Sequence, residues 1–125
     1  MIDFENAAFL KLKPEKSEEA PGVLEFVLLP GEDVHYIFRS GRDYVIFTKK
    51  RILVINTQGI TGKKQDITSL PYNRIQSYSM ETSGTLDWDC ELDLWYSGVG
   101  KIRFEFNRKV DITEIYRLIS QKLLG

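Results

Sequence analysis

Apolar side chains recur in short runs from residue 34 onward, and turn-forming residues separate these runs at regular intervals. The separators include Ser40-Gly41, Pro71-Tyr72 and Ser83-Gly84, and Gly, Ser and Pro favour turns over regular structure. Between the separators lie runs typical of strands, namely 34–39, 43–48, 51–57, 64–69, 73–82, 87–96 and 101–107. Connections this short cannot be parallel crossovers, which need about a dozen residues or more. The pattern therefore predicts a mainly β fold, built as a meander of seven antiparallel strands.

Two of the predicted strands are apolar at successive positions, namely Tyr44 to Phe47 and Ile52 to Ile55. Neighbouring residues of a strand face opposite sides of the sheet, so both faces of this hairpin need a cover. The second face could be covered by segment 23–29, by a C-terminal helix, or by another copy of the chain. In the last case the side chains between subunits would include Val45, Phe47, Leu53 and Ile55.

The strand predicted at 73–82 changes face along its length. Its apolar positions move from Ile75 to Tyr78 and Met80, from odd to even numbers. Such a change indicates a bulge near Gln76. A bend of this kind lets one meander fold into two crossed sheets.

The C-terminal residues predict a helix that lies on the sheet. Asp111 is a good N-cap, Glu114 follows three residues later as in a capping box, and Val110 and Ile115 can form a hydrophobic staple. An apolar stripe then repeats at helical spacing, formed by Ile112, Ile115, Tyr116, Ile119 and Leu123.

The first 33 residues have a different composition from the rest. Residues 13–22 are rich in charged residues and contain two prolines, and a dense apolar run from Val23 to Leu29 follows, ended by Pro30-Gly31. We expect a loosely held N-terminal arm and a short packed segment over 1–33, and the barrel with its helix over 34–125. The whole chain is expected to be one domain.

The net charge of −1 over 125 residues excludes binding to nucleic acid or to a bilayer through total charge. This small value results from cancellation between bands of charge. The bands carry −5 over 1–35, +6 over 36–80, −5 over 81–100 and +3 over 101–125. Opposite bands on one small protein favour contacts between copies, and such assembly is expected to weaken as salt rises.

The acidic band 81–100 contains the predicted strand 87–96. In this strand acids alternate with apolar residues, as on a half-buried strand. In a hairpin that keeps the apolar faces together, Asp93 lies opposite Arg103 and Leu92 opposite Phe104. The solvent-facing acids of this strand are a second set of interface candidates: Asp89, Glu91 and Asp93.

Basic residues lie at strand ends and turns, where they could converge on one rim and bind a phosphate or an anionic lipid. Lysines at strand edges also serve to prevent edge-to-edge pairing, so both interpretations remain open. The candidates for anion binding are Arg39, Arg42, Lys49, Lys50, Arg51, Lys63 and Lys64.

The sequence predicts neither catalysis nor a cofactor. His35 is the single histidine and Cys90 the single cysteine, so one chain cannot supply a zinc site from these residue types, and no nucleophile-base motif surrounds His35. From Asp87, the positions that an EF-hand reserves for Gly and Glu hold Leu92 and Gly98. A lone cysteine, an acidic N-terminus and the absence of a long apolar run predict a cytoplasmic protein without a transmembrane segment.

Several segments resemble the bacterial pleckstrin-homology (PH) family. They are Arg42 to Arg51, Gln58 to Lys64, Leu70-Pro71-Tyr72 and Glu81 to Gly84. The resemblance implies a partly open barrel of seven strands in two crossed sheets, closed at one end by a C-terminal helix. It also implies a small cytoplasmic protein that assembles into ring-shaped homo-oligomers, with no activity attached.

Two departures from the PH domains that bind phosphoinositides speak against inositol-lipid recognition. Those domains have a longer basic loop where this chain has only Ser40-Gly41, and their helix carries a tryptophan where this one has Tyr116 as its aromatic residue. We therefore expect a non-enzymatic PH-like module that self-associates and serves as a scaffold for an unidentified protein partner. The alternative is a module for an anionic lipid or phosphate ligand.

Overall fold

The computed structural model describes residues 1–5, 7–82, 89–107 and 109–125. Within these residues the chain forms strands β1 (Phe9–Pro14), β2 (Val34–Ser40), β3 (Asp43–Thr48), β4 (Arg51–Gln58), β5 (Lys64–Pro71), β6 (Ile75–Glu81), β7 (Cys90–Tyr96) and β8 (Gly100–Phe106). The helices are α1 (Leu24–Val27) and α2 (Ile112–Leu124), with single 3-10 turns η1 (Ser17–Glu19) and η2 (Tyr72–Arg74). The turn predicted at Ser83-Gly84 and the strand start predicted at residue 87 lie outside the described residues.

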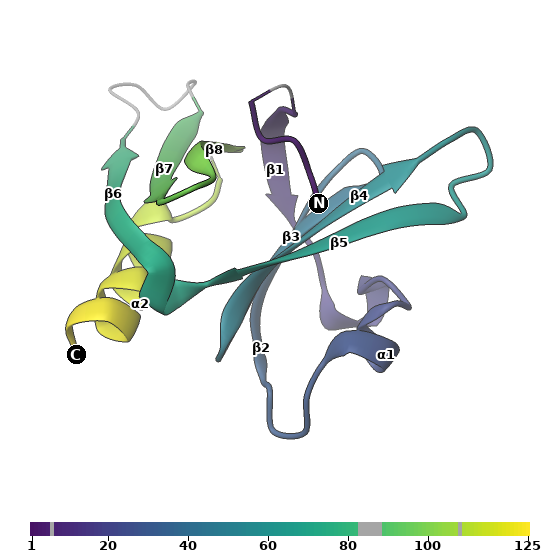
Figure 1. Cartoon of the computed structure of the whole chain (residues 1–125), viewed down its shortest axis with the longest axis horizontal. Helices are drawn as coiled ribbons and strands as arrows, with labels where there is room; N and C mark the ends of the chain where they lie inside the picture. Colours follow the sequence, from purple (N-terminus) through teal and green to yellow (C-terminus); the bar gives the residue numbers. More distant parts are fainter. Residues whose placement is uncertain (6, 83–88, 108) are drawn as a thin grey trace.

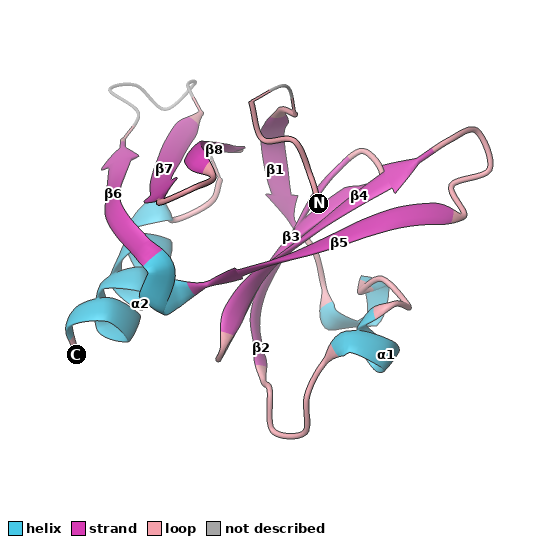
Figure 2. Ribbon diagram, in the orientation of Figure 1, coloured by secondary structure: helices cyan, strands magenta, loops and turns pink. Residues whose placement is uncertain are grey.

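The strands form one curled sheet in the order β5-β4-β3-β2-β1-β8-β7-β6 (Figures 1 and 2). The predicted mainly β class and the C-terminal helix are confirmed. The strand number is corrected: β2 to β8 match the seven predicted strands, and β1 is an eighth. It pairs antiparallel with β2 and parallel with β8, so it joins the two halves of the meander into a continuous sheet.

The pattern of β1 does not alternate, which is why the sequence predicts no strand there. Its buried residues, Phe9 and Leu12, are three positions apart, and the pairing with β8 shifts register between them. Lys11 has a φ of 54°, in the left-handed region that interrupts regular strand geometry. This irregularity re-aims Leu12 into the core while Leu10 stays exposed.

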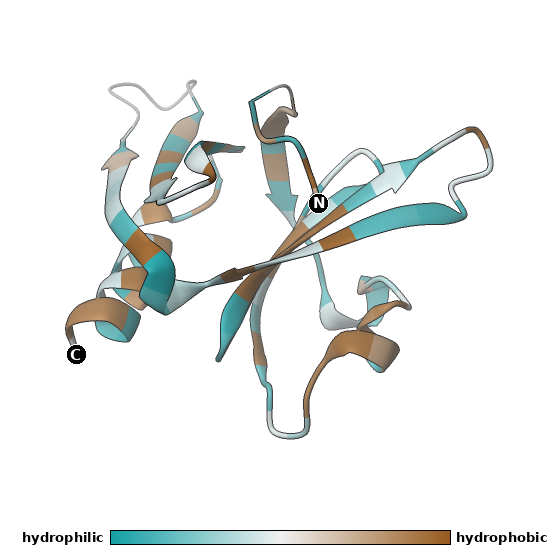
Figure 3. Cartoon of the chain, viewed as in Figure 1, coloured by the Kyte–Doolittle hydropathy of each residue, from teal (hydrophilic) through white to brown (hydrophobic). Residues whose placement is uncertain are grey.

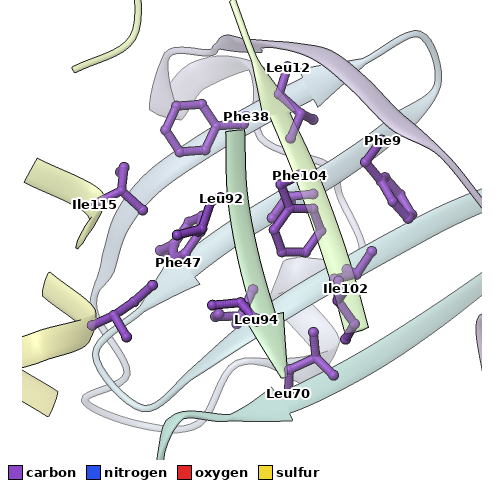
Figure 4. Close-up of a cluster of buried hydrophobic side chains, with 14 of the residues drawn as sticks. Phe9, Leu12, Phe38, Phe47, Leu70, Leu92, Leu94, Ile102, Phe104 and Ile115 are labelled. Atoms are coloured by element: carbon purple, nitrogen blue, oxygen red, sulfur yellow. The ribbon is translucent and has the colours of Figure 1, made fainter. Parts of the chain in front are cut away.

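The main core fills the concave side of the sheet and is closed by α2. Phe38 and Phe106 meet edge to face with centroids 4.9 Å apart, an arrangement that aromatic pairs prefer. Figure 4 shows how side chains of β1, β2, β7 and β8 meet there. Helix α2 contributes Ile112, Ile115 and Ile119, all buried.

A smaller core lies on the opposite face of β2 to β5. It shows which of the three predicted covers, the 23–29 segment, the C-terminal helix or another copy, packs on this face. Ile46, Leu53 and Ile55 pack with Leu24 and its neighbours in segment 20–28, so the N-terminal packed segment is the cover. Val45 and Phe47 belong to the main core instead. All four apolar interface candidates are 0% exposed. Their assignment between subunits is corrected, because the chain's own two cores enclose Val45, Phe47, Leu53 and Ile55.

Three local predictions are confirmed. The register of β6 on β7 shifts between Ile75 and Ser77, which is the expected bulge. Strands β7 and β8 pair Asp93 with Arg103 and Leu92 with Phe104. The Asp111 side chain caps α2 by accepting from the Thr113 N–H.

The sequence predicts that Glu114 completes a capping box at the start of α2, but its side chain has a different partner. Its carboxylate accepts a hydrogen bond of 3.3 Å from the Tyr36 hydroxyl on β2. Burial and the nearby Glu114 charge raise the pKa of Tyr36, which keeps the phenol protonated as the donor. Glu114 therefore ties α2 to strand β2.

Candidate functional site

The seven basic candidates do not converge on one rim, contrary to the expectation. Arg39, Arg42, Lys63 and Lys64 lie at the β2–β3 and β4–β5 turns, and Lys49, Lys50 and Arg51 at the β3–β4 turn. A strand separates these turns, because β3 runs from one to the other. Six residues of strand span roughly 20 Å, so no small anion contacts both groups.

The first group surrounds two turns that are fastened together, which we call the basic tip (Arg42 and residues 59–64). The Arg42 guanidinium donates to the Gly59 carbonyl oxygen at 2.7 Å, and the Thr57 hydroxyl donates to the Arg42 carbonyl oxygen at 2.8 Å. Arg39 lies behind the tip and stacks on Tyr44, 5.4 Å from the ring centroid. Lys63 and Lys64 are exposed, so the basic tip presents free cations.

In the second group, Arg51 is engaged inside the chain. Its Nε and Nη2 donate to the two oxygens of Glu32, each at 2.9 Å. The Glu32 side chain is 0% exposed and also accepts from the Thr48 hydroxyl and the Leu29 N–H. Arg51 is therefore committed to a buried ion pair, and the exposed cations at this turn are Lys49 and Lys50.

The Glu32 carboxylate stays ionised despite its burial. Burial alone would raise the pKa of Glu32, but hydrogen bonds from Arg51, the Leu29 N–H and Thr48 outweigh it and lower the pKa to about 2. The same Arg51 donates to the Val27 carbonyl oxygen at 2.7 Å. This pair clamps the end of α1 to the β3–β4 turn.

The acidic interface candidates each have a partner on β8 of the same chain. Arg103 donates to both Asp93 oxygens at 2.8 and 3.0 Å and lies 3.6 Å from Glu91. Asp89 is hydrogen-bonded to Glu105, whose pKa is raised by burial, by that bond and by the charge of Asp89. These acids thus support the β7–β8 register.

We expect Asp93→Asn to change the free energy of unfolding by less than about 1 kcal/mol, because the Arg103 side chain is 45% exposed and water screens the pair. Urea denaturation at low and high salt measures the effect, which should shrink as salt rises. A loss of several kcal/mol that does not respond to salt would contradict this expectation. It would show that the Asp93–Arg103 pair contributes substantially to the stability of the whole domain.

A groove lies between strand β2 and residues 14–28. We call it the α1–β2 groove. It holds a cavity of about 470 Å³, within the range of ~300–1,000 Å³ of typical ligand pockets. Strand β1 pairs only with Arg39 and Phe38 of β2, and the last backbone bond across is from the Glu15 N–H to the Ile37 carbonyl oxygen. The first half of β2 therefore forms a wall of the groove. Its apolar lining includes Ala20, Leu24, Leu28, Val34, Ile37 and Phe38.

Acidic residues line the mouth of the α1–β2 groove. Glu15 and Glu25 belong to its lining, and residues 14–28 hold four Glu and one Lys, a net charge of −3. A side-chain hydrogen bond to Glu19, followed by burial and the Glu19 charge, raises the pKa of Glu15. Crowded carboxylates of this kind favour a cationic ligand.

The structure adds three features that sequence reasoning did not find: the Glu32–Arg51 pair, the α1–β2 groove, and the full exposure of Ile60 in the turn between β4 and β5. A glutamate after Pro30-Gly31, next to an apolar run, is the signal that could have pointed to a buried partner for Arg51.

Among the described residues, no group of three or more His, Cys, Asp or Glu side chains is placed to hold a metal ion. None of the helices in the described part of the chain is long and apolar enough to cross a membrane.

A curled, mainly antiparallel sheet closed by a C-terminal helix defines a PH-like domain. The model of the bacterial PH domain family matches residues 3–123, and the chain belongs to that family. It is 38% identical over 99 residues to the uncharacterized protein YjqA of Bacillus subtilis (strain 168), covering 78% of this chain and 79% of that protein.

Solved structures agree with this assignment. A DUF1696 family protein with a pleckstrin-homology domain from Shewanella loihica PV-4 superposes with a TM-score of 0.79 at 33% identity, covering 92% of this chain and 99% of that one. A pleckstrin homology domain from Shewanella amazonensis SB2B gives a TM-score of 0.66 at 34% identity, covering 96% and 94%.

Proposed function

We propose that this chain is a non-enzymatic PH-like module that self-associates and serves as a scaffold or protein-interaction platform. The observation that carries the proposal is the separation of charge between two surfaces. The basic tip holds Arg42, Lys63 and Lys64, all exposed, and the mouth of the α1–β2 groove is acidic. Complementary potentials on one chain steer copies toward each other and fix how they meet.

The positions of the two residues best suited to catalysis support a non-enzymatic role. Cys90 is buried in the main core, and burial among apolar groups makes a thiol inert. His35 is exposed on β2, on the other half of the sheet. This placement offers no nucleophile next to a base.

Light scattering coupled to size exclusion at micromolar concentration tests self-association. We expect a mass that is a multiple of the chain's, and a shift toward the monomer when salt rises from about 0.1 to 0.5 M, because salt shortens the screening length. A mass equal to one chain throughout would contradict the proposal.

The second candidate function is binding of an anionic lipid or phosphate at the basic tip, where three exposed cations lie on two turns that are fastened together. Sedimentation with vesicles of anionic and of neutral lipid tests it. Lys63→Glu/Lys64→Glu should abolish binding to anionic vesicles, whereas Lys49→Glu/Lys50→Glu, the same charge change at the opposite turn, should not. Equal sedimentation with both vesicle types would rule out this candidate.

A further inference from the structure

Ile60 stands at the end of the hairpin formed by β4 and β5 with its side chain entirely in solvent, at 103% of the reference exposure. Figure 1 shows this hairpin projecting from the body of the molecule, and Figure 3 shows an apolar end to it. Single exposed apolar residues are common and need no explanation by themselves. Here the neighbours are basic, because Lys63 and Lys64 follow three and four residues later and the Arg42 guanidinium bonds to the carbonyl oxygen of the preceding residue, Gly59.

The turn that carries Ile60 is supported by hydrogen bonds to the β2–β3 turn. Gly59 and Gly62 have φ of 76° and 68°, values that other residues adopt only under strain. The Arg42 bond to the Gly59 carbonyl oxygen fastens the turn to its neighbour. A side chain on a fixed support loses little entropy when it binds, which favours it as an anchor.

The α1–β2 groove has the complementary properties. Its lining is apolar where Leu24, Leu28 and Ile37 meet, and acidic where Glu15 and Glu25 stand. Residues 14–28 carry −3, and the basic tip carries +3 from Arg42, Lys63 and Lys64. An apolar anchor in a pocket, ringed by polar contacts, is the usual arrangement of the energetic centre of a protein interface.

We propose that the basic tip of one copy docks in the α1–β2 groove of the next copy, with Ile60 in the cavity and Lys63 and Lys64 against the Glu15 and Glu25 carboxylates. This inference rests on the proposed self-association and names its surfaces. The tip and the groove are different parts of the chain, so the contact is head-to-tail, and a docked pair keeps one tip and one groove free for further neighbours. Such contacts build a closed ring or an open filament, depending on the rotation between copies.

A pair of charge-reversed variants tests the pairing directly. The tip variant Lys63→Glu/Lys64→Glu keeps an intact groove, and the groove variant Glu15→Lys/Glu25→Lys keeps an intact tip. We expect each alone to assemble about tenfold more weakly or worse than the wild type by light scattering. Mixed in equal amounts, they should recover assembly, because the intact tip of one variant meets the intact groove of the other, and the charge-reversed tip meets a groove whose charge is reversed to match it.

Two further variants complete the experiment. Ile60→Ser removes the anchor and keeps the charges, and we expect a similar loss of assembly. Lys49→Glu/Lys50→Glu makes the same charge change at the opposite turn, and we expect assembly to remain at the wild-type level. Urea denaturation confirms that each variant is folded, which the exposure of the altered side chains leads us to expect.

The outcomes separate this inference from the proposed function. An oligomer that the tip and groove variants leave intact would overturn the docking of tip in groove and leave self-association standing. A wild-type monomer would overturn both. Loss of anionic vesicle binding in the tip variant, with an unchanged oligomer, would assign the basic tip to a membrane surface and overturn the inference. A tip variant and a groove variant that stay monomeric when mixed would show that the two surfaces do not meet.

Discussion

We expect Glu32→Gln to lower the free energy of unfolding by about 3 kcal/mol at pH 7, because the substitution leaves the Arg51 guanidinium without its counter-charge. The wild-type carboxylate accepts two bonds of 2.9 Å from Arg51 and one of 2.7 Å from Thr48. The amide can accept through one atom only and turns an NH₂ group toward the guanidinium. Urea denaturation of both proteins measures the difference.

The pH dependence of this difference follows from the pKa of Glu32, which folding lowers from 4.5 to about 2. A carboxyl whose pKa is lowered in the folded state contributes stability that is fully present above the unfolded value. That contribution is lost as pH falls from 4.5 toward 2, and it amounts to about 3 kcal/mol at about 1.4 kcal/mol per pKa unit. The gap between wild type and Glu32→Gln should therefore narrow over this pH window.

Asp33→Asn is the matched control, because it makes the same chemical change at the neighbouring, exposed residue. We expect its free energy of unfolding to stay within about 0.5 kcal/mol of the wild type. Equal losses for the two variants, or a gap for Glu32→Gln that stays constant from pH 7 to pH 2, would contradict a specific role of the buried pair.

Leu12→Ala should lower the free energy of unfolding by about 3 kcal/mol, since it empties a fully buried site in the main core. Leu12 lies on β1 opposite Phe106 of β8, at the seam that joins the two halves of the sheet. The substitution thus tests whether β1 is an integral strand. Chemical denaturation monitored by tryptophan fluorescence and by circular dichroism measures the loss.

The control for Leu12→Ala is Leu10→Ala on the same strand. Leu10 is 49% exposed, so we expect a loss below about 1 kcal/mol. The Ser40 hydroxyl bonds to the Leu10 carbonyl oxygen, a contact that the substitution does not remove. Similar small effects at both positions would mean that β1 frays from the sheet in solution.

The predicted anion site shows what the sequence can and cannot say about function. The sequence shows seven basic residues at strand ends and turns, which made one anion-binding rim a reasonable prediction. The direction of the strands divides these residues between two ends of the sheet. Burial then decides which cations are free: Arg51 is paired with Glu32, while Lys63 and Lys64 are exposed. The pairing of Arg51 depends on Glu32, a partner 19 residues away in the chain.

The local rules of strand and helix formation were enough to predict β2 to β8 and α2 from the sequence. The spacing of Leu92 and Phe104 decided the β7–β8 register, because a slip by one residue would expose a whole apolar face. The face change after Ile75 predicted the bulge, and Asp111 predicted the start of α2. Each of these signals lies within one or two neighbouring elements.

The tertiary structure alone decided where β1 lies, which segment covers the second face of β3 and β4, and which charges remain free. Strand β1 is irregular at Lys11, so its register comes from β2 and β8 rather than from its own pattern. The apolar run at 23–29 could have packed in several places, and the Glu32–Arg51 pair holds its end against the sheet. These features depend on contacts between residues far apart in the chain, whose free energy no local pattern encodes.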